Sequence, residues 1–275
     1  MNEKFTGICI QLSVSDKPEA NAEQTVALIR EAHRKSGASF FVTPECSNMI
    51  VPDRQKLRQL VQTEDRCPSF VALKNLAKDL SIWICIGSLL LKVDGQEKLV
   101  NRQFLIGPDG DVVNRYDKIH MFDVDIPDGQ TYKESETYEA GKTPRISNLP
   151  WGKLGHGICY DMRFPKLYLG LAERGADFLL APSAFTVFTG QAHWHVLLRA
   201  RAIETGCFVF APAQCGEHAE GRKTYGHSLI VAPWGEVLAE ASDQIGWITA
   251  EIDVDRVTEA RNRVPSLSNQ IDLDF

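Results

Sequence analysis

The sequence contains no long hydrophobic run. Among its 275 residues, no uninterrupted apolar stretch approaches the roughly 20 residues that a transmembrane helix needs. The first apolar segment, residues 8–12, is interrupted by a glutamine and is shorter than the hydrophobic region of a secretory signal. We therefore expect a soluble, cytoplasmic protein with no membrane partner.

Clusters of basic residues are also absent. Lys and Arg number 30 against 36 Asp and Glu, which gives a formal net charge of −6, and the two signs are mixed throughout the chain. A sequence-independent hold on nucleic-acid phosphates requires clustered positive charge. We therefore expect no nucleic-acid partner.

Paired cysteine motifs are missing as well. An odd number of scattered cysteines, with no C-x-x-C pair, is typical of reduced thiols rather than of a disulfide framework or a zinc site. The seven are Cys9, Cys46, Cys67, Cys85, Cys159, Cys207 and Cys215. His193 and His195 lie two residues apart in a predicted helix, so their side chains point in different directions and do not readily share a metal.

No Pro-, Gly- or Ser-rich linker divides the chain, and no repeat is visible, so we expect one domain over residues 1–275 with a polar tail at about 261–275. Apolar periodicity predicts strands and helices that first alternate and later give way to hairpins. This order is typical of an α/β protein with two sheets packed face to face and helices outside. The predicted strands are 5–13, 39–43, 82–91, 100–106, 112–116, 178–181, 207–213, 228–231, 237–241 and 247–252, and the predicted helices are 18–37, 71–80, 167–172, 190–204 and one from about 253.

The stretch 154–165, LGHGICYDMRFP, predicts a strand that runs into a sharp turn carrying Cys159. Gly155 and Gly157 allow the backbone to bend and crowd there, and Pro165 is suited to the first turn of a following helix. A cysteine at such a turn faces the positive end of a helix dipole, which favours the thiolate. On this stretch alone, a catalytic cysteine and a buried structural cysteine are both open interpretations.

Two potential partners of this cysteine lie upstream. Glu45 follows the apolar segment 40–44, and Lys118 follows the predicted strand 112–116. Cys46 is a rival nucleophile next to Glu45, but successive strand residues point to opposite faces, so we expect the two side chains to diverge. A lysine after a strand is usually a solvated edge residue, so Lys118 becomes a functional candidate only through the motif around it.

A long segment that we predict to be irregular joins Lys118 to Leu154. Loops of this length in compact domains are usually functional. Its acids lack the alternating ligand spacing and terminal Glu of a calcium-binding loop, so we do not predict a metal site there. They are Asp123, Asp125, Asp128, Glu134, Glu136 and Glu139.

Three motifs carry a resemblance to a known family: TPE at Glu45, YDKIHMFDVDIP around Lys118 and GICYDMRFP around Cys159. They resemble the Glu-Lys-Cys motifs of the nitrilase, or carbon–nitrogen hydrolase, superfamily, and the similarity runs through nearly the whole chain. The segments PSAFT, RARAIET and AQCG most resemble the deaminated-glutathione amidases of its Nit branch. This resemblance implies a four-layer αββα sandwich.

The resemblance also implies a reaction. It is that of a cysteine-dependent amidase that cleaves a small carboxylated amide through a thioester and releases ammonia, with no metal or organic cofactor. Cys159 would be the nucleophile, Glu45 the base and Lys118 an oxyanion donor, with Glu134 as a second glutamate that orients the lysine. A buried lysine needs such a carboxylate to keep its charge.

For substrate binding, Arg163 could capture a substrate carboxylate, or it could form a salt bridge with Asp161. The backbone N–H of Tyr160 could hold the oxyanion, and a roomier mouth could include Ser183, Phe185 and Thr186. We expect deaminated glutathione to be preferred. The alternatives are an ω-amidase acting on α-ketoglutaramate, a nitrile or carbamoyl-amine hydrolase, and a catalytically silent interaction protein. The family also implies a homodimer, or a higher even oligomer, paired through residues 164–174 and 190–204.

Overall fold

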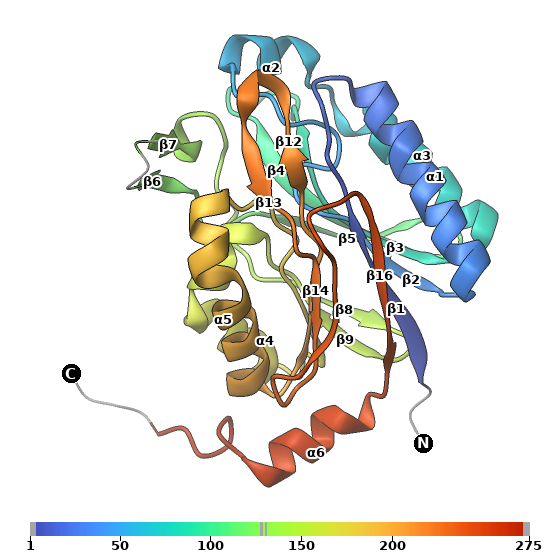
Figure 1. Ribbon diagram of the computed structural model, residues 1–275, viewed down its shortest axis with the longest axis vertical. Coiled ribbons are helices and arrows are strands. Elements are labelled where there is room, and N and C mark those ends of the chain that lie inside the picture. The colour runs from blue at the N-terminus through green and yellow to red at the C-terminus, as the bar shows by residue number, and fades with distance from the viewer. Residues whose placement is uncertain (1–3, 127–128, 130, 272–275) are drawn as a thin grey trace.

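Two six-stranded sheets face each other in the computed structural model of the protein, with helices on both outer faces (Figure 1). The structure describes residues 4–126, 129 and 131–271. Of the residues singled out above, Asp128 and the last four residues of the predicted tail lie outside the described residues.

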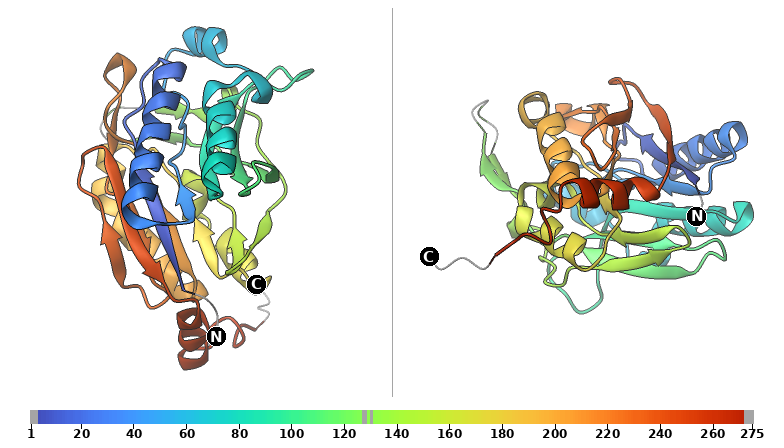
Figure 2. Two further views of the ribbon diagram at one scale, coloured as in Figure 1. Left: turned by 90° about the vertical axis from the view of Figure 1, so that its right-hand side faces the viewer. Right: turned by 90° about the horizontal axis from the view of Figure 1, so that it is seen from below.

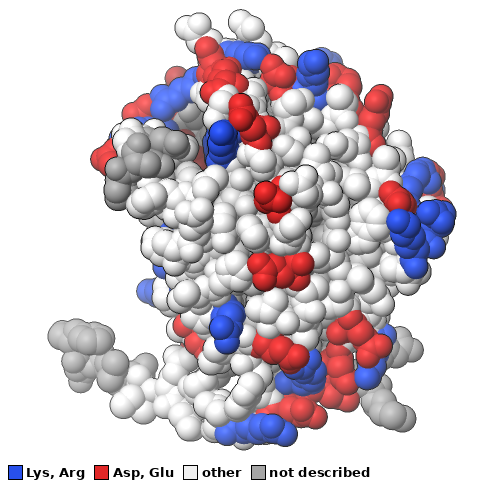
Figure 3. All heavy atoms as spheres, viewed as in Figure 1, with Lys and Arg blue, Asp and Glu red and all other residues white. Residues whose placement is uncertain are grey.

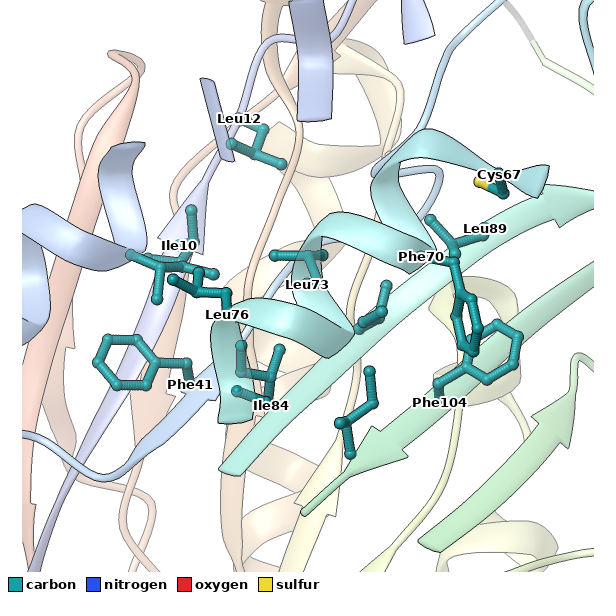
Figure 4. Packing of buried hydrophobic residues seen from close by; sticks show 14 of the residues in the cluster. Ile10, Leu12, Phe41, Cys67, Phe70, Leu73, Leu76, Ile84, Leu89 and Phe104 are labelled. Atoms are coloured by element: carbon teal, nitrogen blue, oxygen red, sulfur yellow. The ribbon is translucent and has the colours of Figure 1, made fainter. Parts of the chain in front are cut away.

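The first sheet has the strand order β16-β1-β2-β3-β4-β5. Its bounds are β16 (Gly246–Ile252), β1 (Phe5–Gln11), β2 (Phe40–Val42), β3 (Trp83–Leu91), β4 (Val100–Ile106) and β5 (Val112–Asp117). Two helices, α1 (Pro18–Ser36) and α3 (Pro68–Leu80), lie side by side on its outer face (Figure 2). Figure 4 shows how α3 places Phe70, Leu73 and Leu76 on the strands beneath it.

The second sheet has the order β15-β14-β11-β10-β9-β8. Its strands are β15 (Val237–Glu240), β14 (Leu229–Val231), β11 (Phe208–Ala211), β10 (Phe178–Leu180), β9 (Gly152–Gly155) and β8 (Ile146–Leu149). The helices α4 (Pro165–Glu173) and α5 (Val187–Thr205) pack on its outer face, and α6 (Asp255–Arg263) follows β16.

The burial of β2 explains the layering. Successive side chains of a strand point to opposite faces, so Phe40 and Val42 enter the core between the two sheets while Phe41 joins the core under α1 and α3. All three side chains are fully buried. A strand covered on both faces therefore reads as a continuous apolar run. The structure confirms the predicted four-layer αββα sandwich.

The helix boundaries follow their sequence signals. Proline stands at the start of α1, α3 and α4, where its missing N–H has no intrahelical partner in any case. The helix α1 ends at Ser36 and is capped by Gly37, whose left-handed backbone (φ 65°) lets its N–H donate to the carbonyl of His33. Among the described residues, no helix is long and apolar enough to cross a membrane.

The segment between Lys118 and Leu154 is less irregular than predicted. It contains the hairpin of β6 (Asp123–Asp125) and β7 (Thr131–Lys133), and then β8. A second hairpin, β12 (Cys215–Glu217) with β13 (Lys223–Tyr225), and the helix α2 (Arg54–Leu60) were also not predicted. These elements are short and largely polar, so they lack the apolar periodicity from which the other elements were predicted.

Gly87 of β3 lies in close contact with a loop of each sheet. A Cβ atom there would lie 1.9 Å from the carbonyl oxygen of Thr43 and 2.5 Å from Cβ of Pro182, which follows β10 of the other sheet. Any larger residue would push these segments apart. Gly87 thus allows the loop before Glu45 and the loop after β10 to meet.

Candidate active site

Two strand ends of the first sheet supply a buried ion pair. Glu45 comes three residues after β2, and Lys118 directly follows β5. Nζ of Lys118 lies 2.9 Å from Oε1 of Glu45 and 2.9 Å from both carboxylate oxygens of Glu134, which begins a short 3-10 helix after β7. The side chains of Lys118 and Glu45 are 2% and 5% exposed. Lys118 is therefore a buried, doubly paired cation rather than a solvated edge residue.

The charges of this cluster stabilise one another. Burial alone would raise the pKa of Glu45, but the adjacent Lys118 ammonium, the Cys159 thiol and the Arg222 charge together hold that pKa below its ordinary value. Burial alone would lower the pKa of Lys118, yet the carboxylates of Glu134 and Glu45 raise it well above its ordinary value. Glu45 is consequently an ionised carboxylate that can accept a proton.

Further donors fix the orientation of the Glu45 side chain. Its Oε2 accepts the backbone N–H of Ala184 at 3.0 Å, and its Oε1 accepts the amide of Asn101 at 3.0 Å. The same Asn101 amide lies 3.4 Å from Oε1 of Glu134, and Gln214 donates to the Glu45 carbonyl at 2.9 Å. Ala184 and Gln214 follow β10 and β11 of the second sheet, so both sheets hold this carboxylate.

Cys159 stands four residues after β9, at the first position of the 3-10 helix Cys159–Arg163. Its backbone is left-handed (φ 48°), a strained conformation for a residue with a side chain, and its N–H donates to the carbonyl of Pro182 at 2.9 Å. A Cβ at Gly157 would lie 2.5 Å from the Tyr168 hydroxyl, so the predicted crowding is present.

The expected preference for the thiolate is not found at Cys159. Burial and the neighbouring Glu45 carboxylate raise the pKa of its thiol far above the ordinary value, and the opposing effect of Lys118 is smaller. The helix that begins at Cys159 has only five residues, so its dipole is weak against a nearby full negative charge. The resting side chain is therefore a neutral thiol that faces an ionised base.

Asp161 pins the cysteine turn to the first sheet. Its fully buried carboxylate accepts the Tyr116 hydroxyl at 2.7 Å, the Ile158 N–H at 2.9 Å and the His120 N–H at 3.0 Å. Tyr116 is in β5, and His120 follows two residues after Lys118. Because Asp161 is fully engaged in this way, it is not the salt-bridge partner considered above for Arg163.

A cavity of about 500 Å³ opens over this cluster. Of the residues selected from the sequence, all but Ser183 line it: Glu45, Lys118, Glu134, Cys159, Tyr160, Arg163, Phe185 and Thr186. Ser183 is fully buried, and its hydroxyl donates to the Ala181 carbonyl at 2.9 Å. The structure thus places Ser183 beneath the loop rather than at the cavity.

Cys46 also lines the cavity, contrary to the expected divergence from Glu45. The expectation assumed that the strand continues, but β2 ends at Val42 and Cys46 has a left-handed backbone (φ 58°). Burial raises the pKa of its thiol well above the ordinary value, and Glu45 raises it further. Two neutral thiols therefore border one cavity.

Several cavity residues escaped the sequence analysis. Asn101 lies inside β4, where it reads as an ordinary strand residue, and Arg222 and Tyr132 belong to the two unpredicted hairpins. No local signal marks Asn101, because its role depends on which strand lies beside it. In the described part of the chain, no group of three or more His, Cys, Asp or Glu side chains has an arrangement suited to a metal ion.

The sequence profile of carbon–nitrogen hydrolases matches residues 9–262. The chain belongs to the carbon–nitrogen hydrolase family. This hydrolase is 40% identical over 270 residues to the deaminated glutathione amidase of Synechocystis, covering 97% of this chain and 98% of that protein. It is 38% identical over 265 residues to the human protein of the same name, and the match covers 95% of this chain and 80% of the human protein.

Solved structures show the same relationship. Nit3 of Saccharomyces cerevisiae, a member of branch 10 of the nitrilase superfamily, superimposes with a TM-score of 0.86 at 30% identity, covering 96% of this chain and 95% of that one. The NitFhit protein of Caenorhabditis elegans gives a TM-score of 0.90 at 36% identity, and the match covers 97% of this chain and 65% of NitFhit. The resemblance to the nitrilase superfamily is confirmed, and the protein is a hydrolase of carbon–nitrogen bonds other than peptide bonds.

Proposed function

We propose that the hydrolase cleaves its amide through a thioester on Cys159, with Glu45 as the base. The arrangement that carries this proposal is a neutral thiol opposite a carboxylate held ionised by Lys118. Glu45 takes the thiol proton as sulfur attacks the amide carbon, and then delivers it to the departing nitrogen. It next removes a proton from the water that hydrolyses the thioester.

Lys118 acts in this scheme as an electrostatic partner of the transition state. It faces the developing oxyanion together with the backbone N–H of Tyr160, and such a donor is commonly worth about 3 kcal/mol. Glu134 holds the ammonium through two contacts of 2.9 Å, and the Asn101 amide donates to both Glu45 and Glu134. Glu134 and Asn101 are thus positioning residues.

For the substrate we propose deaminated glutathione, the compound in the names of the curated relatives. It is an α-keto acid whose side-chain amide nitrogen belongs to cysteinylglycine. Hydrolysis of this amide would therefore release an amine, and the ammonia expected from the sequence applies to a primary amide such as α-ketoglutaramate. The cavity of about 500 Å³ is of the size that holds a small ligand.

Arg163 is the proposed ligand of the keto-acid carboxylate. In the described ranges no carboxylate lies within 4 Å of its guanidinium, which contacts His193 at 3.2 Å and lies over the Phe185 ring at 5.2 Å. A cation without a protein counter-charge in a substrate cavity is suited to bind an anion. Tyr160, Phe185 and Thr186 complete this side of the cavity.

We further propose a homodimer, or a higher even oligomer, paired through residues 164–174, which include α4, and through α5. Its exposed side carries Phe188, Val196 and Ile203, which are 46%, 69% and 55% exposed and are spaced at helical intervals. On the face shown in Figure 3, charged side chains are scattered and the surface over α5 is largely uncharged. Such an apolar face is typical of a subunit contact.

Two broader expectations remain proposals. Residues 1–275 would act as a single hydrolase domain, since the family profile reaches from residue 9 to 262 and strands β1 and β16 pair with each other. The protein would work in the cytoplasm, since all seven cysteines are free thiols.

The test compares kcat/KM for deaminated glutathione and α-ketoglutaramate, with mass spectrometry of enzyme quenched during turnover. We expect the higher value for deaminated glutathione and an acyl adduct on the peptide containing Cys159. A preference for α-ketoglutaramate would make the protein an ω-amidase. The absence of any adduct and of any amide hydrolysis would favour the silent interaction protein.

A further inference from the structure

Arg222 is a second cation of the active-site cavity without a carboxylate partner. It directly follows the short 3-10 helix between β12 and β13. Its Nη2 lies 3.4 Å from the Ala184 carbonyl, its guanidinium lies 5.5 Å from the centre of the Tyr132 ring, and its Nε is buried with no hydrogen-bond partner. In the described residues, no acidic side chain comes within 4 Å of it.

The other charges near this hairpin are already engaged. Glu220, two residues before Arg222, contacts Lys56 at 3.9 Å and accepts the Asp53 N–H at 3.1 Å. Arg54, which lines the same cavity, is paired with Glu136. Arg222 therefore differs from its neighbours in keeping its charge available to the cavity.

Arg222 lies on the Glu45 side of the cavity. Both contact Ala184, because its carbonyl accepts from Arg222 while its N–H donates to Glu45. Arg163, in contrast, belongs to the turn of Cys159 and lies over Phe185. The Ala184 N–H also lies near the Cys159 thiol, so the two arginines differ in the group on which each charge acts. Arg222 lowers the pKa of Glu45, whereas Arg163 interacts with Cys159.

We infer that Arg222 binds a carboxylate on the amine half of the substrate and so selects amides whose leaving group is acidic. The inference rests on the proposed function, in which Glu45 protonates the leaving nitrogen, so that the amine half must lie on the Glu45 side. Deaminated glutathione carries such a carboxylate on its glycine, whereas α-ketoglutaramate has none. Arg163 and Arg222 would then hold the two ends of one dianionic substrate.

The test uses three substrates: deaminated glutathione, the same compound with a glycinamide end, and α-ketoglutaramate. Arg222→Met should lower kcat/KM for deaminated glutathione about 30-fold, mainly through KM, which corresponds to about 2 kcal/mol. The loss on the other two substrates should be at least about tenfold smaller. Arg222→Lys should restore part of the loss, because the charge returns without the guanidinium geometry. The matched control is Arg54→Met, which removes a guanidinium that already has a partner.

An equal loss on all three substrates would show that Arg222 only supports the Ala184 loop, and no loss on deaminated glutathione would also overturn the inference. Binding measured by calorimetry on Cys159→Ala protein tests the Arg222 subsite separately from the proposed function. If the wild type does not cleave deaminated glutathione, the function fails. The subsite still stands if Cys159→Ala binds the acid more tightly than the glycinamide and adding Arg222→Met removes the difference. Equal binding, or no binding, of the two ligands overturns it.

Discussion

The two sheets contribute different parts of one candidate active site. The first sheet delivers the charged groups, Glu45 after β2 and Lys118 after β5, both almost fully buried. The second sheet delivers the thiol of Cys159 and the backbone N–H of Ala184, both from loops after parallel strands. The site therefore exists only where the ends of the two sheets meet.

This division has an electrostatic consequence. Burial and the first-sheet carboxylate raise the pKa of the second-sheet thiol, while the first-sheet lysine helps to keep that carboxylate ionised. In the proposed reaction, a thiol alone in the second sheet would have no base, and the ion pair in the first sheet would have no nucleophile. The experiments below separate the two contributions, beginning with the largest expected effect.

Removing the second sheet's nucleophile should abolish the reaction. We expect Cys159→Ala to fold and to lose a factor of about 10⁴ or more in kcat, because no other group forms the covalent intermediate. Steady-state kinetics and thermal melting measure the two properties. An acyl adduct on another cysteine would move the nucleophile elsewhere.

Neutralising the first sheet's base should cost roughly 100-fold or more in kcat. Glu45→Gln keeps an acceptor for the Ala184 N–H but no longer takes the thiol proton. Lys118→Met should also be severe, and the double variant should lose far less than the product of the two single losses, since both serve one transition state. Near-normal turnover of either single variant would contradict the assignment.

Loosening the link between the sheets should have an intermediate effect. Asp161→Asn removes the charge that receives Tyr116 and two backbone N–H groups, so we expect about 2 kcal/mol lower unfolding free energy and a lower kcat. Tyr116→Phe removes one of these bonds and should cost about 1 kcal/mol. Denaturant titration with parallel kinetics measures both. Unchanged kcat in Asp161→Asn would show that the turn is held by other contacts.

A second link between the sheets should make stability depend on pH. His156, fully buried, bonds Gln103 of the first sheet at 2.6 Å and Ser147 of the second at 2.7 Å, and burial lowers its pKa to about 3. Between its unfolded value near 6.5 and 3, the unfolded chain binds more protons than the folded one. Its contribution to stability is therefore complete above pH 6.5 and is lost as the pH falls.

The expected slope from this group approaches 1.4 kcal/mol per pH unit at most. Denaturant titrations of the wild type and His156→Gln between about pH 4 and pH 7 measure this slope by difference. His156→Gln should be less stable at neutral pH and should have the shallower pH dependence. Parallel curves for the two proteins would mean that His156 is not responsible.

The smallest effect is expected for the thiol of the first sheet. Cys46 shares the cavity with Cys159, but it belongs to the same loop as Glu45 and is not needed in the proposed reaction. Cys46→Ser should change kcat/KM by less than about threefold, a typical limit for a residue outside the chemistry. Kinetics on both substrates provide the measurement, and a loss of 100-fold would make Cys46 part of the mechanism.

Much of this architecture can be read from local sequence. The apolar run around Phe41 predicts a doubly covered strand, and Pro165 predicts the start of a helix, since both signals act within a few residues. Glu45, Lys118 and Cys159 are identifiable because each stands in a motif after a strand. The polar hairpins around Tyr132 and Arg222 are not, because their pairing is not encoded in an apolar pattern.

The sequence alone determined the layered architecture, the residues of the three motifs and the position of each motif after a strand. Only the tertiary structure decided that Cys46 reaches the cavity while Ser183 does not. The strand β2 ends at Val42 and Cys46 has a left-handed backbone, whereas Ser183 is buried beneath a loop. The tertiary structure also decided that the thiol is neutral and that Arg163 and Arg222 keep free charges. These properties depend on burial and on charges far away in the chain, and neither is a function of local sequence.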